Sequence, residues 1–496
     1  MNKFALYLIL GLSLLGACTS KTNQEEPTAD SKPVPFTTTI FDSPDAGKAS
    51  QTRLDDPRPN ILFILTDDQP YHTVEFMPTV RETLLKQGVN FENGFVTTPL
   101  CCPSRVSILS GEYAHNHEVY TDRFPMGGAG KYDDSSSFAV WLETAGYRSA
   151  YYGKYLNEYD AVEPFGYVPP GWGDWFAFLG KNLAEEDVNS QYYSDYSISD
   201  NGNISEYAGD KSVFSADLLT QKAVDFISSS RDEPFFLYVS YYNPHSPYFW
   251  ADRHADQFRS SGEIKAEAYR PTNFMEEDVS DKPAFLQDLN PIAVEKIDIS
   301  YRQILRSLLS VDDGVASMLR MLDKTGLSDK TIVVYLSDNG LTVGKHRLGL
   351  TKNCAYEECV RVPFIVYAPA LFPARTDSHL VANIDLAPTF AALAGAPIPG
   401  SVDGMSLLPL LEDQHSAWRD ALLIEHWPTE EGVGSKIPEY YAIRTAEWKY
   451  VEYSTGEREL YDLVNDPNEL DNLAGDQSHQ DIEAELANRL AELKKE

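Results

Sequence analysis

Residues 61–69 read ILFILTDDQ, a run of five apolar residues that stops at a cluster of polar ones. An apolar run without polar alternation is typical of a β-strand that is buried on both faces of its sheet. The same pattern recurs at three later places: SAYYGKYLN at 149–157, FFLYVSYYNPHS at 235–246 and IVVYLSDNG at 332–340. These four segments therefore predict four buried strands that each end in polar residues.

Segments of helical periodicity separate these strands. The clearest one precedes residue 332 and stops at Gly326. Its apolar face consists of Ile304, Leu308, Val311, Val315, Met318 and Leu322. Buried strands that alternate with helices predict an α/β fold, with a mixed, largely parallel sheet covered by helices on both faces. Because ligands bind such sheets at the carboxyl ends of the strands, we expect the four polar clusters to meet at one edge.

The pattern changes after about residue 420. The segments 440–443 and 448–453 are typical of antiparallel strands, and 481–493 is typical of a closing helix. We therefore predict a main domain over 57–420 and a small C-terminal α+β subdomain over 421–496.

The first 18 residues form an export leader. Lys3 gives it a positive start, and residues 4–15 supply an apolar segment too short to span a bilayer. It ends in Leu15-Gly16-Ala17-Cys18, which resembles the lipobox of bacterial lipoproteins. Lipidation of Cys18 is the favoured interpretation, and an ordinary cleaved signal is the alternative. Residues 19–56, rich in Ser, Thr, Pro and Asp, predict a flexible tether. We expect an exported protein, in the periplasm or at the cell surface, whose membrane attachment is a lipid anchor.

The chain has 496 residues and a strong excess of acidic side chains. It carries 41 basic and 75 acidic residues, a formal net charge of −34. This charge argues against nonspecific binding to nucleic acid, so we expect no nucleic-acid partner. It also repels polyanionic substrates, and an anion site on this protein therefore requires a local group of cations.

Four cysteines remain beyond Cys18: Cys101, Cys102, Cys354 and Cys359. In an exported protein, Cys354 and Cys359 are candidates for one small disulfide. Adjacent cysteines such as Cys101 and Cys102 rarely bridge each other, and the four are too few and too badly spaced for a zinc cluster. The pair at 101–102 needs another explanation.

Hard oxygen ligands stand in two of the polar clusters: Asp67 and Asp68 follow the first strand, and Asp338 and Asn339 follow the last. This set suits Ca²⁺, with Mg²⁺ as the second choice, and not zinc. Each pair has an alternative interpretation, a helix cap for the first and a hairpin turn for the second. The sequence SDNG also occurs at 199–202, where it predicts a plain hairpin, but only the later copy follows a buried-type strand.

The most specific pattern in the chain is Cys101-Cys102-Pro103-Ser104-Arg105. Pro103 suits the first turn of a helix, and apolar residues continue that helix to Gly111. Cys101 is thus predicted at a helix N-terminus, where the dipole and the free N–H groups favour an anion. An unmodified buried cysteine in a tight turn is the alternative.

The pattern Cys-x-Pro-Ser-Arg is similar to the signature that maturation enzymes read in the formylglycine-dependent (type I) sulfatases. The segments TTPLCCPSRVSILSGEYAHNHEVY at 97–120 and GKYLNEY at 153–159 resemble this family too, in particular its N-acetylglucosamine-6-sulfatases and heparan 6-O-endosulfatases. The resemblance fades over 251–298 and returns in ELYDL at 459–463. It implies an alkaline-phosphatase-like fold, a sulfated carbohydrate substrate and a formylglycine-generating maturation enzyme as a partner.

The resemblance also implies the modified residue and the metal ligands. Cys101 becomes formylglycine, whose hydrate attacks the sulfur of a sulfate ester. The implied ligands of Ca²⁺ are residue 101 with Asp67, Asp68, Asp338 and Asn339.

Further roles follow from the same resemblance. Arg105 orients the hydrate, and Asp338 accepts its proton. Lys154 and Lys352 bind sulfate oxygens, where they stabilise developing charge, although a solvent-facing lysine is the alternative for Lys352. His245 protonates the leaving alcohol.

One position departs from the family pattern. Many sulfatases have Gly-Lys-x-His after the second strand, whereas this chain has Leu156 where that His would stand. The base that returns the sulfated intermediate to the aldehyde is therefore unassigned. His115 and His117, just beyond the nucleophile helix, are candidates, and the alternative for one of them is a packed histidine behind the site.

The alcohol that carries the sulfate is less well defined. Sulfated polysaccharides or oligosaccharides are expected, either algal ones such as ulvan or glycosaminoglycan-like ones. An aromatic segment, with Trp172, Trp175, Phe176 and Phe178, either stacks on sugar rings or forms core. His426 and Trp427 are further candidates to reach the cleft.

Two rival functions stay open on the sequence. A phosphodiesterase or phosphonate monoester hydrolase of the same superfamily uses an equivalent nucleophile and metal site. A noncatalytic lipoprotein that binds glycans is the alternative from another class, and it has no need of Cys101 or the carboxylates.

Overall fold

The computed structural model describes residues 56–179, 192–194, 196–207, 213–230, 233–260, 264, 269–290, 292–400, 402–414, 417–429 and 436–495. The predicted leader with Cys18, and the predicted tether except Asp56, lie outside these residues. Among the helices in the described ranges, none combines the length and the apolar character that crossing a membrane requires.

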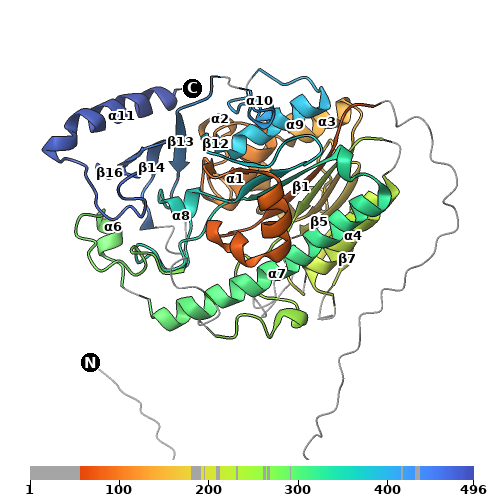
Figure 1. The fold of residues 1–496 in the computed structure, drawn as a ribbon, viewed down its shortest axis with the longest axis horizontal. Helices are drawn as coiled ribbons and strands as arrows, with labels where there is room; N and C mark the ends of the chain where they lie inside the picture. The colour runs from red at the N-terminus through yellow and green to blue at the C-terminus, as the bar shows by residue number, and fades with distance from the viewer. Residues whose placement is uncertain are drawn as a thin grey trace, which may run out of the picture. The chain divides into compact units, whose positions relative to one another are not determined.

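Ten strands of the described chain form one large mixed sheet, in the order β11-β2-β10-β9-β1-β8-β4-β5-β6-β7. Figure 1 labels β1, β5 and β7 of this sheet. Their bounds are β1 Asn60–Thr66, β2 Val89–Phe91, β4 Arg148–Gly153, β5 Asp174–Leu179, β6 Ser197–Asp200, β7 Asn203–Glu206, β8 Phe235–Ser240, β9 Thr331–Ser337, β10 Phe364–Tyr367 and β11 Arg375–Asp377. A second, two-stranded sheet pairs β3 Gly94–Phe95 with β12 Val381–Ala382.

The four strands predicted from the sequence are β1, β4, β8 and β9, and all four predictions are confirmed. They lie together in the middle of the sheet and pair in parallel with one another and with β5. The register aligns their carboxyl ends, because Thr66 pairs with Ser337, and Ser240 pairs with both Leu65 and Gly153. Parallel pairing in this register brings the polar segments that follow the strands to one edge.

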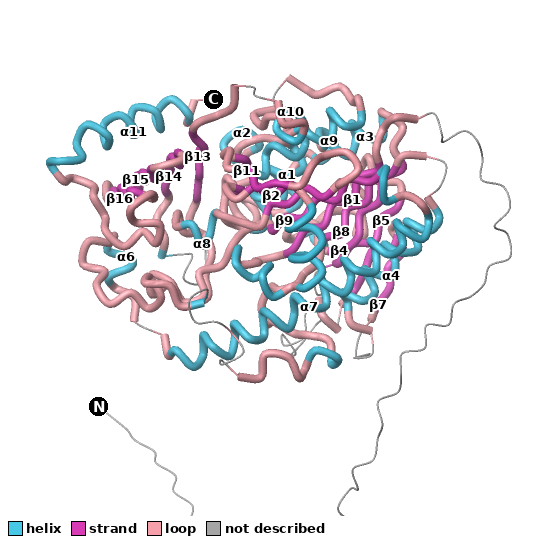
Figure 2. The backbone as a smooth tube through the Cα atoms, viewed as in Figure 1, coloured by secondary structure: helices cyan, strands magenta, loops and turns pink. Residues whose placement is uncertain are grey.

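Both faces of the sheet are covered, which explains the uninterrupted apolar runs. Ile61, Phe63 and Leu65 of β1 pack into a core with helices α1, α3 and α9, whereas Leu62 and Ile64 pack into the opposite core with α4 and α7. Figure 2 shows the strands of this sheet between the two groups of helices. The bounds of these helices are α1 Cys101–Ser110, α3 Phe138–Thr144, α4 Ser215–Ser229, α7 Val294–Thr325 and α9 Leu386–Ala394.

Helix α7 contains the predicted apolar face and ends, as predicted, before Gly326, which has a positive φ of 71°. The helix begins earlier than the sequence pattern indicated. Its first turns at 294–303 are mostly polar and bury only Ile297 and Tyr301, so they lack a clear apolar periodicity. Four short helices complete the described α-helices of the main part and its connections: α2 Ala114–His117, α6 Ala284–Gln287, α8 Glu357–Val360 and α10 Leu408–Leu411.

The C-terminal part forms an antiparallel four-stranded sheet in the order β13-β14-β15-β16, with helix α11 against it. The bounds are β13 Ala421–His426, β14 Tyr440–Thr445, β15 Trp448–Tyr453, β16 Arg458–Asp462 and α11 Gln480–Leu493. Its strands share a third core with α8 and with the disulfide Cys354–Cys359, so the expected disulfide is confirmed. The boundary at residue 420 stays a prediction.

The SDNG sequence at 199–202 lies in the β6–β7 hairpin, as predicted. The aromatic segment at 172–178 belongs to the interior. Trp172 and Trp175 pack with Tyr151 on one face of the sheet, and Phe176 and Phe178 are buried in the core of the other face. Trp172, Trp175 and Phe176 therefore form core, whereas Phe178 also lines a cavity together with Lys154.

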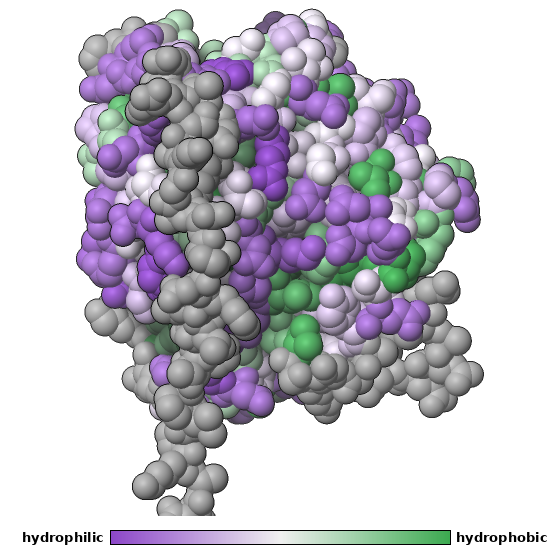
Figure 3. Space-filling view, turned by 90° about the vertical axis from the view of Figure 1, so that its right-hand side faces the viewer, coloured by the Kyte–Doolittle hydropathy of each residue, from purple (hydrophilic) through white to green (hydrophobic). Residues whose placement is uncertain are grey.

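The surface agrees with the acidic composition. Hydrophilic side chains cover much of the face drawn in Figure 3, and hydrophobic ones form small groups between them. With a formal net charge of −34, cations near a ligand must come from a particular local group.

A glycine substitution tests the close packing at the strand ends. Gly153, with φ 117°, lies where an added Cβ would stand 1.9 Å from the carbonyl oxygen of Ser240. Gly153→Ala should lower the free energy of unfolding by about 3 kcal/mol or more, since the backbone must move away from β8. The matched control is Gly146→Ala, which has φ 81° and open space around the Cβ, and should cost about 1 kcal/mol. Urea unfolding measures both, and equal costs would contradict this account of β4.

Candidate active site at the strand ends

Asp67 and Asp68 follow β1 directly and are held by the neighbouring strands. The backbone N–H of Asp67 donates to the carbonyl of Asn243, and that of Asp338 donates to the carbonyl of Thr66, at 3.1 and 3.0 Å. Asp68 has a positive φ of 63°, and both carboxylates are buried. The helix-cap alternative is wrong for this pair, because their side chains accept bonds from other elements.

Asp338 and Asn339 lie beside this pair at the end of β9. Asp338 Oδ1 accepts a bond from the backbone N–H of Asp68 at 3.1 Å, and the Asn339 amide donates to Asp68 Oδ1 at 2.7 Å. Asn339 Oδ1 is buried and has no hydrogen-bond partner in the described chain. The later SDNG copy is therefore not a plain hairpin turn.

Cys101 is the first residue of α1 and faces the same carboxylates. Its Sγ lies 3.4 Å from Asp67 Oδ1 and 2.6 Å from Lys352 Nζ. Burial and the Asp67 carboxylate raise the pKa of the thiol. Ser104 fixes the start of the helix, because its hydroxyl donates to the carbonyl of Asp338 at 2.5 Å. The predicted position at a helix N-terminus is confirmed.

Two lysines reach the carboxylates from different elements. Lys154 Nζ lies 2.5 Å from Asp67 Oδ2, and Lys352 Nζ lies 2.7 Å from Asp68 Oδ1. Burial disfavours the charged lysines, but the two aspartates outweigh it and raise the pKa of both ammonium groups. Lys352 is thus a residue of the site, and the solvent-facing alternative is wrong.

Arg105 contacts residues at the ends of three strands, β4, β8 and β9. Its Nε donates to Asp338 Oδ2 at 2.8 Å, and its Nη1 donates to the carbonyl of Lys154 and to Ser240 Oγ at 2.7 and 2.8 Å. Its Nη2 lies 3.6 Å from Asp67 Oδ2. The side chain is completely buried, so it neutralises Asp338 and fixes the spacing of the strand ends.

His245 lies on the open side of the group. Its Nδ1 is 2.8 Å from the carbonyl oxygen of Ser246, which can only accept, so Nδ1 carries a hydrogen. Nε2 therefore faces the site, 3.6 Å from Asp68 Oδ2. Burial lowers the pKa of this imidazole, although the Asp68 and Asp67 carboxylates oppose the effect.

The three carboxylates titrate differently because their surroundings differ. Burial favours their neutral forms, but Lys154 and Lys352 dominate around Asp67 and Asp68 and lower the pKa of both. For Asp338, burial and the adjacent Asp67 carboxylate prevail over Arg105 and raise the pKa to about 7. A group of this kind exchanges protons readily near neutral pH.

The donor set fits a hard divalent cation. Ligand atoms of Asp67, Asp68, Cys101 and His245 lie within 4.8 Å of one another, and the unpartnered Asn339 Oδ1 lies in a residue that contacts Asp68. An amide oxygen buried without a donor is costly unless a ligand satisfies it. Carboxylate and amide oxygens are the ligands that Ca²⁺ prefers, so these residues suit the expected ion.

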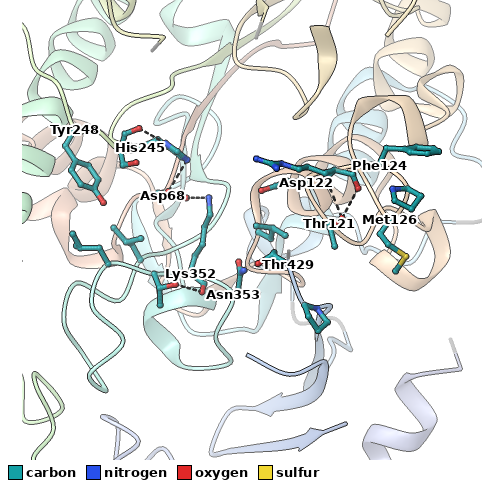
Figure 4. A pocket seen from close by; sticks show the side chains of 18 residues that line it. Asp68, Thr121, Asp122, Phe124, Met126, His245, Tyr248, Lys352, Asn353 and Thr429 are labelled. Carbon is teal, nitrogen blue, oxygen red and sulfur yellow. Dashed lines mark hydrogen bonds and ion pairs between the residues drawn. The ribbon is translucent and has the colours of Figure 1, made fainter. Parts of the chain in front are cut away.

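A cavity of about 380 Å³ opens onto this group (the main cavity). Figure 4 shows Asp68, His245 and Lys352 on one side of it and Asp122, Phe124 and Met126 on the other. A second cavity of about 280 Å³ includes Lys154, and both cavities share His245 and Arg123.

The two histidines suggested as the unassigned base each contact a polar side chain. His115 Nδ1 is 2.7 Å from Glu425 Oε1, and His117 Nε2 is 3.0 Å from Ser107 Oγ. Burial lowers the pKa of His117 to about 3, so this imidazole is neutral at physiological pH. Leu156 is buried in the core beside α1.

His426 does not line the main cavity, contrary to the expectation. It is buried with its ring tilted against that of Tyr440, and Trp427 packs against Tyr120. The cavity is instead lined by the next two residues, Pro428 and Thr429.

Sequence reasoning missed the wall that faces the catalytic group. This wall is the segment Thr121–Gly127, of which Thr121 to Met126 line the main cavity (the 121–127 loop). The segment has neither a strand nor a helix period, so its sequence gave no signal of its place. The exposed apolar pair Phe124 and Met126, unusual in so acidic a chain, was the one available hint.

A thiol at a helix start, surrounded by carboxylates and lysines at the strand ends of an alkaline-phosphatase-like sheet, is the arrangement of an anion-handling hydrolase. Comparison with known proteins defines the family. The Sulfatase family matches residues 59–396, and the C-terminal family of N-sulphoglucosamine sulphohydrolase matches 344–496. The human N-acetylglucosamine-6-sulfatase is 33% identical over 472 residues, which cover 86% of this chain and 82% of that protein. The chain belongs to the sulfatase family, as expected.

Other relatives are longer than this chain. It is 34% identical to an extracellular sulfatase SULF-1 homologue of Drosophila melanogaster over 74% of its own length and 33% of that protein. It spans about half, 54%, of a Caenorhabditis elegans homologue.

Solved structures share the fold. One, in complex with its substrate D-glucosamine-2-N,6-O-disulfate, superposes with a TM-score of 0.72 at 25% identity and covers 88% of this chain and 98% of its own. A phosphonate monoester hydrolase from Silicibacter pomeroyi reaches a TM-score of 0.68 at 22% identity, covering 88% of this chain and 95% of its own. The fold alone therefore does not select the ester that is cleaved.

The donor set predicts a measurable response to calcium. At a Ca²⁺ concentration one hundred times Kd, binding should stabilise the folded protein by about 2.7 kcal/mol, and Mg²⁺ should do so less. Asp68→Asn and Asn339→Leu should abolish most of this gain, since the first removes a negative charge and one carboxylate oxygen and the second removes the amide oxygen. Asp160→Asn is the matched control, because Asp160 lines only the second cavity. Thermal unfolding with and without a chelator measures the gain, and an equal response in all variants would contradict this ligand set.

Proposed function

We propose that this protein hydrolyses sulfate esters of glycosaminoglycan-like saccharides, using a formylglycine made from Cys101. The observation that carries the proposal is the position of Cys101: it begins α1, it lies within 3.4 Å of Asp67 and its Sγ contacts Lys352. A hydrated aldehyde at this carbon supplies an oxygen nucleophile in place of sulfur. Bound Ca²⁺ would polarise a sulfate oxygen and favour the anionic hydrate.

The side chains around residue 101 divide the chemical work. Asp338 takes the proton from the attacking hydroxyl, which suits its raised pKa of about 7. Lys154 and Lys352 hold sulfate oxygens and offset the charge that develops as the ester bond breaks. His245, in the imidazolium form that the Asp68 and Asp67 carboxylates favour, delivers its Nε2 proton to the leaving alcohol and keeps its Nδ1 proton on the Ser246 carbonyl.

Release of sulfate from residue 101 needs a base for the second hydroxyl of the hydrate. Since Leu156 replaces the expected histidine and His115 and His117 contact Glu425 and Ser107, His245 is the best placed proton acceptor among the described residues. Having given up its proton to the alcohol, its Nε2 is free to take the next one. We therefore assign both proton transfers to His245.

The glycosaminoglycan-like substrate is supported by the relatives. The human protein is named for N-acetylglucosamine 6-sulfate, and the structural neighbour at 25% identity was solved with a sulfated glucosamine. An algal polysaccharide such as ulvan is the second candidate for an exported enzyme. Export itself, with an anchor at Cys18, is proposed from the leader alone.

Because one structural neighbour is a phosphonate monoester hydrolase, phosphonate ester hydrolysis is the alternative to sulfate ester hydrolysis. A sulfate monoester carries one negative charge and a phosphate monoester about two at neutral pH, so a pocket with two lysines and an acidic surround favours the lower charge. Turnover of matched sulfate, phosphate and phosphonate esters distinguishes the two activities, and faster phosphonate turnover would favour the rival.

Replacement of Cys101 tests the proposal most directly. Protein made with a formylglycine-generating enzyme should show, at residue 101, the mass change for replacing the thiol and one hydrogen by an aldehyde oxygen. Cys101→Ala should release sulfate at least about a thousandfold more slowly and still bind the saccharide. Lys352→Ala should cost about 100- to 1000-fold in kcat.

The Cys102→Ala variant is the control, because Cys102 lies in the core and is absent from the group of possible metal ligands. Full sulfate release by Cys101→Ala would refute the assigned nucleophile. Binding without release in every matured variant would instead favour a noncatalytic glycan-binding protein.

A further inference from the structure

The 121–127 loop is fixed to both halves of the active site. Asp122 Oδ1 accepts a bond from the backbone N–H of Cys102 at 2.9 Å, which ties the loop to the first turn of α1. Glu158 Oε2 accepts a bond from the backbone N–H of Phe124 at 2.8 Å, which ties it to the segment after Lys154. A bridge between Thr121 and Gly127 closes the loop on itself. Its backbone is therefore held at a set position beside residue 101.

Arg123 is the unusual residue of this loop. The other charged side chains that line the main cavity all have partners: Asp68, Asp122, His245 and Lys352. For the Arg123 guanidinium, the described part of the chain provides neither an ion pair nor a side-chain hydrogen bond, and the residue is exposed. In a chain with 75 acidic residues, most arginines can find a carboxylate partner. An unpaired guanidinium beside the main cavity is therefore available to bind an anionic ligand.

The position of Arg123 defines what it can reach. It lines the main cavity and also the second cavity, so it lies where the two adjoin, as His245 does. A saccharide whose sulfate ester lies between Lys154 and Lys352 must extend past His245, since this residue serves the leaving alcohol. The sugar body thus passes the junction that Arg123 lines.

We propose that Arg123 binds a second anionic group of the substrate, a sulfate or a carboxylate carried on the same sugar or on its neighbour. A planar guanidinium offers paired N–H donors that match such an oxyanion. This inference rests on the proposed sulfatase function and narrows its substrate class to saccharides with at least two anionic groups. A local attraction between Arg123 and the second anionic group would also let a protein of net charge −34 bind a polyanion.

Matched substrates test the proposal. The matured wild-type protein and its Arg123→Ala variant are compared on N-acetylglucosamine 6-sulfate, with one anionic group, and on glucosamine-2-N,6-O-disulfate, with two. A charge-assisted hydrogen bond is worth about one to two powers of ten in affinity. Arg123→Ala should therefore raise KM for the disulfate about tenfold or more and leave KM for the monosulfate within about twofold.

Two further comparisons sharpen the result. Arg123→Lys should recover part of the affinity, because it restores the charge without the paired donors. Arg320→Ala, on the exposed side of α7, removes a charge away from both cavities and should change neither KM. A 6-sulfated disaccharide with and without a uronic acid carboxylate shows whether the second anion is a carboxylate or a sulfate.

The outcomes distinguish the role of Arg123 from the sulfatase function. Equal effects of Arg123→Ala on mono- and dianionic substrates, or no effect on either, would overturn the role of Arg123 and leave the sulfatase function intact. Absence of sulfate release from every saccharide by the matured wild-type protein would overturn the proposed function, and this inference with it.

Discussion

Three buried carboxylates face two buried cations and one partly buried cation where the parallel strands end, and the remainder of the site depends on the balance of these charges. Asp67, Asp68 and Asp338 are buried, and each would be costly if left unpaired. Lys154, Lys352 and Arg105 supply the compensation, and they come from three different segments of the chain. The charge pairs thus hold β1, β4, β9 and α1 in one arrangement, and they also provide the groups that sulfate chemistry requires.

The same charges give the site its reactivity. The lysines can serve either the carboxylates or an incoming anion, so a divalent cation beside Asp67 and Asp68 would free them for substrate. Asp338 differs from its neighbours because its pairing with Arg105 does not fully offset its burial and the nearby Asp67. A single cluster therefore contains permanently ionised metal ligands and a carboxyl that can exchange a proton.

The proposed determinants of specificity, in contrast, lie on loops. The carboxylates and lysines lie on strand ends and on the segment that carries Lys352, whereas the 121–127 loop and Thr429 line the cavity that opens beside them. A fold shared with a phosphonate monoester hydrolase can therefore serve other esters through other loops.

The sequence alone predicted the four central strands β1, β4, β8 and β9, the helix that begins at Cys101 and the candidate site residues. It did so through local signals: uninterrupted apolar runs, helical periodicity and the Cys-x-Pro-Ser-Arg pattern with the family resemblance that it carries. It did not place Arg123, and it left the aromatic segment at 172–178 open, since neither carries a periodic signal of its own. Those features depend on contacts between segments far apart in the chain, such as Asp122 with Cys102 and Glu158 with Phe124. Only the tertiary structure decided them, because burial and charge pairing are properties of the folded surroundings and not of a residue's sequence neighbours.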